Sequence, residues 1–373
     1  MAEQRKGLSG YTTGTCAQAA AKAAAVCLLT GRKEEKVTVK LPGGQCITLQ
    51  PELWETEPDL VSCAVKKYSG DDPDVTNGVY VYASVSRTET EGILLDGGVG
   101  VGRVTKPGLD QPVGAAAINR IPRKMICQTA EEVLEASGMP GGLQIIISIP
   151  DGVKLAAKTF NPRLGIEGGI SVLGTTGIVE PMSEKALIDT IQVEINVKRA
   201  EGRAWLIAAP GNYGLDFLKE TYGIPAEIAV KCSNYVGETI DMAVDSGAKG
   251  LVFAAHIGKF IKVAAGIMNT HSRYGDARME VAASAMLRAG LPAQMARAAL
   301  DCGTTDEMLS LMKDEERNKF LEALLDRIQF YLQNRAGEMK CGAVIFSNQS
   351  GMLGMTKNAD ALLQKASKEL VEQ

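Results

Sequence analysis

Three threonines and two glycines stand close together near the start of the sequence, in the run GYTTGT over residues 10–15. An alanine-rich stretch, typical of a closely packed helix, follows directly. The start of a helix leaves about four backbone N–H groups without partners and carries about half a positive charge, so it can seat an anion. The hydroxyls of Thr12, Thr13 and Thr15 and the small Gly14 fit such a seat. An N-cap on a buried helix remains the simpler alternative.

A second segment, residues 161–183, has the same character. It contains five glycines together with Thr175 and Thr176. Because each glycine inside a helix or strand costs about 0.5–1 kcal/mol relative to alanine, we expect a loop. Arg163 adds a forked guanidinium that suits a carboxylate or a phosphate. Turns within a β-rich domain are the alternative, and both interpretations stay open.

The third glycine segment, residues 94–125, includes the run GVGVG over residues 98–102. Its spacing matches neither the dinucleotide-binding pattern G-x-G-x-x-G nor the phosphate loop G-x-x-x-x-G-K-[ST]. Five cationic side chains accompany the glycines: Arg103, Lys106, Arg120, Arg123 and Lys124. A solvated charged face is the usual explanation of such a run. Together with the two threonine segments, however, the cations favour a pocket for a polyanion, with Lys106 and Arg163 among its contacts.

Small polar residues recur after the apolar runs of the second half. Ligands of open α/β sheets bind outside the carboxyl ends of the strands, so these positions are candidates for binding a nucleoside-like cofactor. Helix capping and turn formation explain the same residue types equally well. The candidates are Gly211, Asn212, Gly214, Ser233, Asn234 and Gly258.

The sequence contains two histidines, His256 and His271. Both are candidates for proton transfer, although a lone histidine more often has a structural or capping role. No C-x-x-C pair, H-E-x-x-H helix or G-x-S-x-G elbow is present, so we expect no metal bound by the protein and no hydrolase chemistry. A reaction that depends mainly on positioning is favoured.

Length and composition limit the classes of protein further. The 373 residues predict two domains, and 40 basic against 44 acidic side chains give a net charge of -4, which argues against nucleic acid as a partner. Eight scattered cysteines indicate reduced thiols. With no signal peptide and no apolar run of about 18 residues, we expect a cytoplasmic protein that does not contact membranes and could form a homo-oligomer.

The pattern of elements must position these residues. We predict an α+β domain over residues 1–185, rich in β-structure, followed by an α/β domain over 186–373 with a mostly parallel, Rossmann-like sheet. The expected strands of the first domain are 36–41, 45–50, 60–68, 78–87 and 143–150, and its helices are 15–29 and 122–137. In the second domain we expect strands at 204–210, 226–232, 250–256 and 342–348, and helices at 183–200, 212–222, 234–247, 257–267, 277–300 and 316–336.

Six ordered blocks of the sequence resemble the CbiD family. They are GYTTGTCAQAAAKAA, DVTNGVYVYASV, GRVTKPGLDQPVGAAAINRIPRKMI, FNPRLGIEGGISVLGTTGIVEPMS, CSNYVGETID and HIGKFIKVAAGIMNTHS. The resemblance implies methyl transfer from S-adenosylmethionine, as co-substrate, to C1 of cobalt-precorrin-5B in anaerobic cobalamin biosynthesis. Cobalt would then be carried by the substrate only, and the acid arms of the macrocycle would explain the anion seats. Thr12, Thr13, Gly14, Thr15, Lys106, Arg163, Thr175 and Thr176 would contact this substrate.

The sequence departs from the family pattern at two positions. Ala115 stands where a Glu of a Glu-Pro pair is expected, and Ala255 stands where a glycine usually precedes the histidine. The first departure removes a carboxylate that could have taken part in catalysis. Two other functions remain as alternatives: a module that shelters a tetrapyrrole intermediate without catalysis, and a phosphoryl-transfer enzyme.

Overall fold

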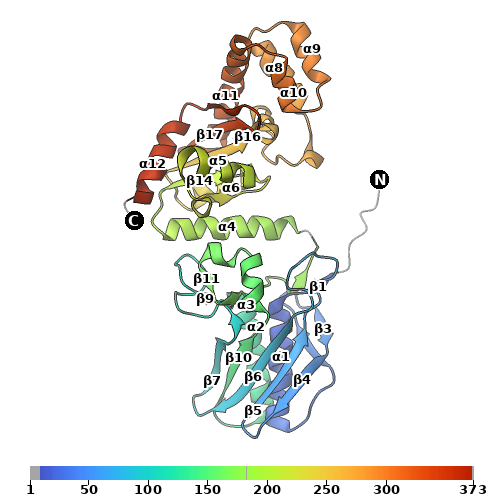
Figure 1. The fold of residues 1–373 in the computed structure, drawn as a ribbon. Helices are drawn as coiled ribbons and strands as arrows, with labels where there is room; N and C mark the ends of the chain where they lie inside the picture. Colours follow the sequence, from blue (N-terminus) through green and yellow to red (C-terminus); the bar gives the residue numbers. More distant parts are fainter. Residues whose placement is uncertain (1–8, 182, 372–373) are drawn as a thin grey trace. The chain divides into compact units, whose positions relative to one another are not determined.

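The computed structural model describes residues 9–181 and 183–371. The chain divides into two compact units, Met1–Glu184 and Lys185–Gln373, which Figure 1 shows from blue to red along the sequence. The sequence had led us to place a domain boundary after residue 185. Both units combine helices and sheets, so the mixed α/β character expected from the sequence is confirmed.

The first unit is built on a five-stranded sheet in the order β4-β5-β6-β10-β7. Neighbouring strands are antiparallel except β10 and β7, which are parallel. The strands are β4 (Pro51–Thr56), β5 (Leu60–Lys66), β6 (Tyr80–Thr88), β7 (Gly92–Gly97) and β10 (Gly142–Ser148). A separate hairpin joins β2 (Val37–Lys40) to β3 (Cys46–Leu49).

Two long helices, α1 (Thr13–Thr30) and α2 (Arg120–Ser137), pack side by side against this sheet (Figure 1). Helix α1 is buried on almost every side, and seven of its buried residues are alanines. Small side chains let its backbone approach both the sheet and α2. Gly31, with φ of 73°, ends the helix in the left-handed conformation that glycine adopts without strain.

Three short strand pairings and an isolated bridge lie among the glycine segments of the first unit. Strand β1 (Gly10–Tyr11) pairs with β13 (Ile178–Val179), β8 (Gly100–Val101) with β12 (Gly169–Ile170), and β9 (Arg103–Val104) with β11 (Ile166–Glu167). An isolated bridge joins Ile118 to Val172. Between them run the short helices α3 (Gly152–Leu155), η1 (Ala156–Lys158) and η2 (Asn161–Leu164). These pairings join the three segments that the sequence singled out.

The second unit contains a five-stranded sheet in the order β15-β14-β16-β17-β18. Its strands are β14 (Trp205–Ala209), β15 (Val230–Lys231), β16 (Gly250–His256), β17 (Lys340–Ser347) and β18 (Gly351–Met355). The first four are mutually parallel, and the edge strand β18 is antiparallel. From β14 the chain passes to β15 on one side and then to β16 on the other, so the strand order reverses between β14 and β16.

Helices cover both faces of this sheet. Alternate residues of the strands belong to two different cores, with Phe253 in one core and Val252 in the other. This double burial explains why the strands are continuously apolar in sequence. The helices are α4 (Glu184–Ala200), α5 (Asn212–Tyr222), α6 (Val236–Asp245), α7 (Ile257–Phe260), α8 (Arg278–Arg288), α9 (Ala293–Leu300), α10 (Thr305–Ser310), α11 (Asp314–Ala336) and α12 (Ala359–Val371), with 3-10 turns η3 (Ala226–Ile228), η4 (Ile261–Ala265) and η5 (Ser272–Tyr274).

Several expected elements differ from the structure. The helix expected over 277–300 is two helices, α8 and α9, because Gly290 has φ of 73° and Pro292 precedes α9. The strand expected over 226–232 is only Val230–Lys231, preceded by a 3-10 turn. The sequence pattern did not predict β4, β7, β18, α10 or α12. None of the helices in the described ranges has the length and apolar character needed to cross a membrane.

Candidate functional site

The start of α1 is joined to the second glycine segment by backbone hydrogen bonds. The N–H of Gly14 donates to the carbonyl of Leu173 at 3.0 Å, and the N–H of Thr12 donates to that of Gly177 at 3.2 Å. Gly14 also allows contact with α2, because a Cβ at this position would lie 2.7 Å from Cγ of Pro122. Two of the predicted anion-binding segments are therefore bound to one another.

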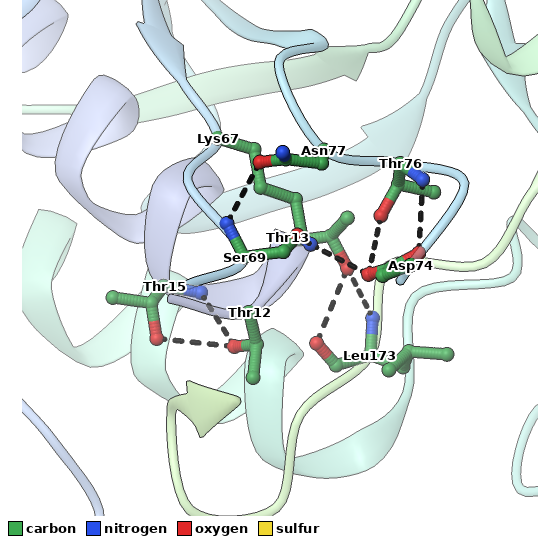
Figure 2. A network of polar contacts seen from close by, with 9 residues as sticks. All are labelled: Thr12, Thr13, Thr15, Lys67, Ser69, Asp74, Thr76, Asn77 and Leu173. Carbon is green, nitrogen blue, oxygen red and sulfur yellow. Dashed lines mark hydrogen bonds and ion pairs between the residues drawn. The ribbon is translucent and has the colours of Figure 1, made fainter. Parts of the chain in front are cut away.

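The three threonine hydroxyls complete this junction (Figure 2). Thr13 donates to the carbonyl of Leu173 and accepts from its N–H, at 3.2 and 3.0 Å. The Thr15 hydroxyl donates to the carbonyl of Gly177 at 2.7 Å, and its N–H donates to the hydroxyl of Thr12, which caps the helix. All three side chains are buried, and Thr15 has no exposed surface.

The chain itself thus occupies the anion seat that we expected at the start of α1. Carbonyl oxygens of Leu173 and Gly177 take the hydrogen bonds that an anionic ligand would need. The expected contact of Thr15 with substrate is corrected on this ground, because a wholly buried side chain cannot touch a ligand. Thr12, Thr13 and Gly14 hold the loop between residues 173 and 177 in place, and this loop exposes Thr175 and Thr176.

The structure places Lys106, which follows β9, and Arg163 of η2 in neighbouring segments. The pairing of β9 with β11 places the two segments side by side, and Thr105 donates to the carbonyl of Gly165 through both its N–H and its hydroxyl. The side chain of Lys106 packs over Gly165, where a Cβ would lie 2.4 Å from its Cγ. Both cationic residues are partly exposed. The Arg103 guanidinium forms an ion pair with Asp96 at 2.7 Å.

An ion pair between the buried Lys67 and the partly exposed Asp74, next to the start of α1, was not predicted from the sequence (Figure 2). The Lys67 ammonium donates to the Asp74 carboxylate at 2.7 Å and to the Ser69 hydroxyl, while Thr76 donates to Asp74 through its N–H and its hydroxyl. Burial acts to raise the pKa of Asp74, but the hydrogen bonds and charge of Lys67 and the bonds from Thr76 outweigh it, so the pKa lies below its usual value. The alternation of Lys, Ser, Asp and Thr in this turn was the available signal.

In the second unit, the predicted cofactor residues lie where the strand order reverses. The segment after β14 carries Gly211, Asn212 and Gly214, whereas β16 ends at His256 and is followed by Gly258. Gly214 is a packing position, because a Cβ there would lie 2.4 Å from the carbonyl oxygen of Ala254. A Cβ on Gly211 would meet no atom within 4 Å, so open space adjoins this residue.

The segment after β15 contacts the loop that carries His271. Asn234 accepts the N–H of Thr270 at its carbonyl at 2.9 Å, and Tyr235 forms a bridge with Asn269. Ser233 has φ of 51°, a left-handed conformation that is uncommon for a residue other than glycine and that often occurs at functional sites. Two blocks far apart in sequence therefore meet beside the sheet.

Both histidines cap short helices. Nδ1 of His256 accepts the N–H of Gly258 at 3.0 Å, and Nδ1 of His271 accepts the N–H of Arg273 at 3.1 Å. The neutral ring then carries its proton on Nε2, which can donate a hydrogen bond. Burial lowers the pKa of His256 below its ordinary value, and the Asp306 carboxylate opposes this only in part.

His256 lies among aromatic and polar side chains. Its ring centroid is 5.7 Å from that of Phe346 and 6.5 Å from that of Tyr213. After β17, the Ser347 hydroxyl donates to Asp306 at 2.7 Å and accepts the N–H of Gln349. Sequence analysis noted the polar end of β17 but not its partner Asp306, because α10 was not predicted.

Two lysines adjoin the segment after β14. The Lys231 ammonium donates to Oδ1 of Asn212 at 2.8 Å, and the Lys259 ammonium donates to the carbonyl of Pro210 at 3.4 Å. Burial, together with the charges of Lys231 and Lys262, lowers the pKa of Lys259. We did not select either lysine from the sequence, although each follows or ends a predicted strand.

No group of three or more His, Cys, Asp or Glu side chains that could hold a metal ion occurs among residues 9–181 and 183–371. The carboxyl edge of the second sheet instead offers hydrogen-bond donors, two ammonium groups and aromatic rings. Such an arrangement can bind and orient an organic ligand.

Comparisons with known proteins connect both units to one family. Residues 1–181 match the family model described as CbiD, and residues 269–357 match the model described as CbiD, C-terminal domain. A protein of Ruminiclostridium cellulolyticum named cobalt-precorrin-5B C(1)-methyltransferase is 48% identical over 328 residues, which cover 88% of this chain and 85% of the relative. A protein of the same name from Alkaliphilus metalliredigens is 41% identical, over 95% of this chain and 94% of its own length.

A solved structure is also similar. It is the cobalamin biosynthesis protein CbiD from Archaeoglobus fulgidus, 29% identical, with a TM-score of 0.39 and with 72% of this chain and 83% of that chain covered. The identities to the two methyltransferases extend through both units and well above 30%. The chain therefore belongs to the CbiD family.

Proposed function

We propose that this protein transfers a methyl group from S-adenosylmethionine to C1 of cobalt-precorrin-5B, a step of anaerobic cobalamin biosynthesis that takes place in the cytoplasm. The observation that carries the proposal is the 48% identity, over 88% of the chain, to a relative named for this reaction. Cobalt enters as part of the substrate, and the donor is a co-substrate.

The loops of the first unit support binding of the macrocycle. Its acetate and propionate arms are carboxylates, and forked or point-charge donors such as Arg163 and Lys106 bind carboxylates well. Thr175 and Thr176 lie exposed on the loop that the buried threonines hold. We propose these four residues as substrate contacts, and Thr12, Thr13, Gly14 and Thr15 as the residues that position them.

The carboxyl edge of the second sheet supports binding of the methyl donor. We propose that the sheet acts as a Rossmann-like platform, with the donor at the reversal of strand order between β14 and β16. Gly211 leaves room for the ligand, and Asn212, Ser233, Asn234 and Gly258 supply polar groups around it. Gly214 acts indirectly, by letting α5 pack on β16.

Methyl transfer from a sulfonium needs in-line approach of the ring carbon to the methyl group, with the thioether leaving on the far side. Correct orientation of two bound reactants can account for about 7–11 kcal/mol of the barrier, so no nucleophile on the protein is required. Because its Nδ1 accepts a backbone N–H, we propose that His256 donates a hydrogen bond through Nε2 at this site. The same hydrogen bonding makes His271 a donor, and its role stays a prediction.

The test is a methyl-transfer assay with the purified protein. Cobalt-precorrin-5B, or its precursor cobalt-precorrin-5A, is incubated with S-adenosylmethionine labelled in the methyl group, and the label is sought on the macrocycle. We expect one labelled methyl group at C1 and one equivalent of S-adenosylhomocysteine. Tight binding of the macrocycle without transfer would indicate the sheltering module instead. Binding of ATP without binding of S-adenosylmethionine would point to phosphoryl transfer.

A further inference from the structure

We infer that Lys231 and Lys259 form a carboxylate-binding site at the carboxyl edge of the second sheet. The inference rests on the proposed function, since it assigns a part of the ligands to that site. Neither lysine belongs to the residues that the sequence pattern selected. The site is defined by the two ammonium groups and by the open space at Gly211.

The geometry brings both ammonium groups to the same turn. In the sheet, Lys231 of β15 pairs with Ala209 of β14, and the next residue after Ala209 is Pro210. Lys259 reaches this turn from α7 and donates to the Pro210 carbonyl at 3.4 Å, while Lys231 donates to Oδ1 of Asn212 at 2.8 Å. Pro210 and Asn212 flank Gly211, so the two cations bind to the residues on either side of the open position.

Both cations have neutral partners. Within the described part of the chain, no carboxylate lies within ion-pair distance of the ammonium of Lys231 or Lys259. The nearby Glu194 accepts the backbone N–H of Lys231 at 2.9 Å rather than its ammonium. The thiol of Cys232 supplies no counter-charge at neutral pH, because burial raises its pKa to about 12. Lys262, the third lysine nearby, lies 3.6 Å from the carboxylate of Asp276.

This arrangement is costly without an anion. Lys259 is partly buried, and its lowered pKa reflects that burial and the like charges of Lys231 and Lys262. Cations that are withdrawn from water normally have a partner of opposite charge. A bound carboxylate would supply it and would accept hydrogen bonds from both ammonium groups, which are strong when the donor and acceptor are both charged.

The ligands of the proposed reaction offer a carboxylate from two sources, and neither ligand contains a phosphate. One source is the amino-acid end of S-adenosylmethionine, and the other is an acid arm of the macrocycle. The chemistry that Lys231 and Lys259 recognise is the same in both cases. The two sources are separated by measuring the two ligands independently.

The experiment measures binding by calorimetry for the full-length protein and for Lys259→Met, Lys231→Met and a matched control, Lys219→Met. Lys219 lies exposed toward the far end of α5, so its loss changes net charge equally without touching the turn. Each protein is titrated with S-adenosylmethionine, with decarboxylated S-adenosylmethionine, and with the macrocycle. Hydrogen bonds to charged groups account for about a ten- to hundredfold change in affinity.

If the donor is the source, the wild type prefers S-adenosylmethionine over its decarboxylated form by at least about tenfold. Lys259→Met and Lys231→Met then lose this preference, while Lys219→Met keeps it. If the macrocycle is the source, the two variants bind the macrocycle at least about tenfold more weakly than the wild type does. Their affinities for S-adenosylmethionine and for its decarboxylated form then equal those of the wild type. Lys231→Met gives the same information if Lys259→Met does not fold.

The inference is overturned if methyl transfer proceeds in the wild type and both lysine variants bind all three ligands within about twofold of Lys219→Met. A wild type that binds neither donor nor macrocycle would overturn the proposed function itself. The two failures are therefore distinguishable by the behaviour of the unmodified protein.

Discussion

The two ring nitrogens of His256 have different roles. Nδ1 accepts the N–H of Gly258 and so starts α7, while Nε2 keeps the proton of the neutral ring. Burial lowers the pKa of the ring, so His256 is neutral at physiological pH. The role we propose for His256 is therefore that of a hydrogen-bond donor through Nε2.

This assignment predicts different results for two substitutions. His256→Asn keeps a side-chain cap, so its thermal stability should stay close to the wild type, whereas His256→Ala should lose about 1 kcal/mol. Both should lower kcat/KM by about tenfold or more, because both remove the Nε2 donor. The measurements are thermal unfolding and the methyl-transfer assay at several pH values.

The pH dependence of thermal stability serves as a control for both His256 variants. Because the folded pKa lies below the unfolded value of about 6.5, the wild type should lose stability only as pH falls below 6.5, and the two variants should lack that part of the loss. Turnover of His256→Asn equal to that of the wild type would remove the donor role.

We expect Asp74 to make the stability of the first unit depend on pH. Its carboxylate is bound by Lys67 and Thr76, and its folded pKa is lowered. The stabilisation is thus fully present above the unfolded pKa of about 3.9 and is lost as pH falls through the folded pKa. Asp74→Asn should destabilise the unit by about 3 kcal/mol at pH 7, because the buried Lys67 ammonium loses its counter-charge.

Urea unfolding at pH 7 and at pH 3 checks this prediction. The difference in the free energy of unfolding between Asp74→Asn and the wild type should be smaller at the lower pH. Asp59→Asn, in an exposed turn, is the matched control and should resemble the wild type at both values. An equal difference in the free energy of unfolding at both pH values would show that the charge of Asp74 does not stabilise the fold.

At the scale of elements, the turn from β14 into α5 contains two glycines with different tasks. A Cβ at Gly214 would lie 2.4 Å from the Ala254 carbonyl oxygen, whereas one at Gly211 would meet nothing within 4 Å. Gly211 has φ of 179°, an extended backbone that alanine also adopts. Packing of α5 on β16 therefore depends on Gly214, whereas Gly211 borders open space, where we propose that the ligand binds.

Two alanine substitutions should separate these tasks. Gly214→Ala should destabilise the protein by about 1–3 kcal/mol because of overpacking. Gly211→Ala should change stability by less than about 1 kcal/mol and weaken binding of S-adenosylmethionine, because its methyl group enters the open space. Thermal unfolding and calorimetric titration measure the two effects. Strong destabilisation by Gly211→Ala with unchanged ligand affinity would contradict this assignment.

Most elements were predictable, and the errors have physical causes. Alternating and continuous apolar runs located β5, β6, β10, β14, β16 and β17, because burial on one or both faces leaves that pattern. Strand β4 begins with Pro51 and was not recognised, and the edge strand β18 carries two glycines in five residues. Pairing with β5 and β17, not local sequence, makes these segments strands.

At the scale of the whole molecule, each unit has cores of its own. Ile126 of α2 belongs to the main core of the first unit, and Leu324 of α11 belongs to that of the second; neither side chain is exposed. A unit with its own core can lose stability by itself, so local destabilisation need not spread along the chain.

Core substitutions should show this separation. Ile126→Ala should destabilise the first unit by about 2–5 kcal/mol, and Leu324→Ala should do the same to the second. Hydrogen exchange followed by mass spectrometry should then increase within Met1–Glu184 for the first variant and within Lys185–Gln373 for the second. Equal increases in both units for either variant would mean that the chain unfolds as one cooperative body.

The sequence by itself determined the character of most segments, because helix and strand patterns, glycine-rich loops and polar strand ends depend on nearby residues. Its six ordered blocks also pointed to the family to which the chain belongs. Only the tertiary structure decided which polar groups remain available. The hydroxyl of Thr15 donates to the carbonyl of Gly177, 162 residues away, so it is already hydrogen-bonded. Lys231 and Lys259, by comparison, belong to different elements but both contact the turn after β14. Hydrogen bonds between distant segments leave no periodic signal in sequence, so their partners emerge only when the chain is folded.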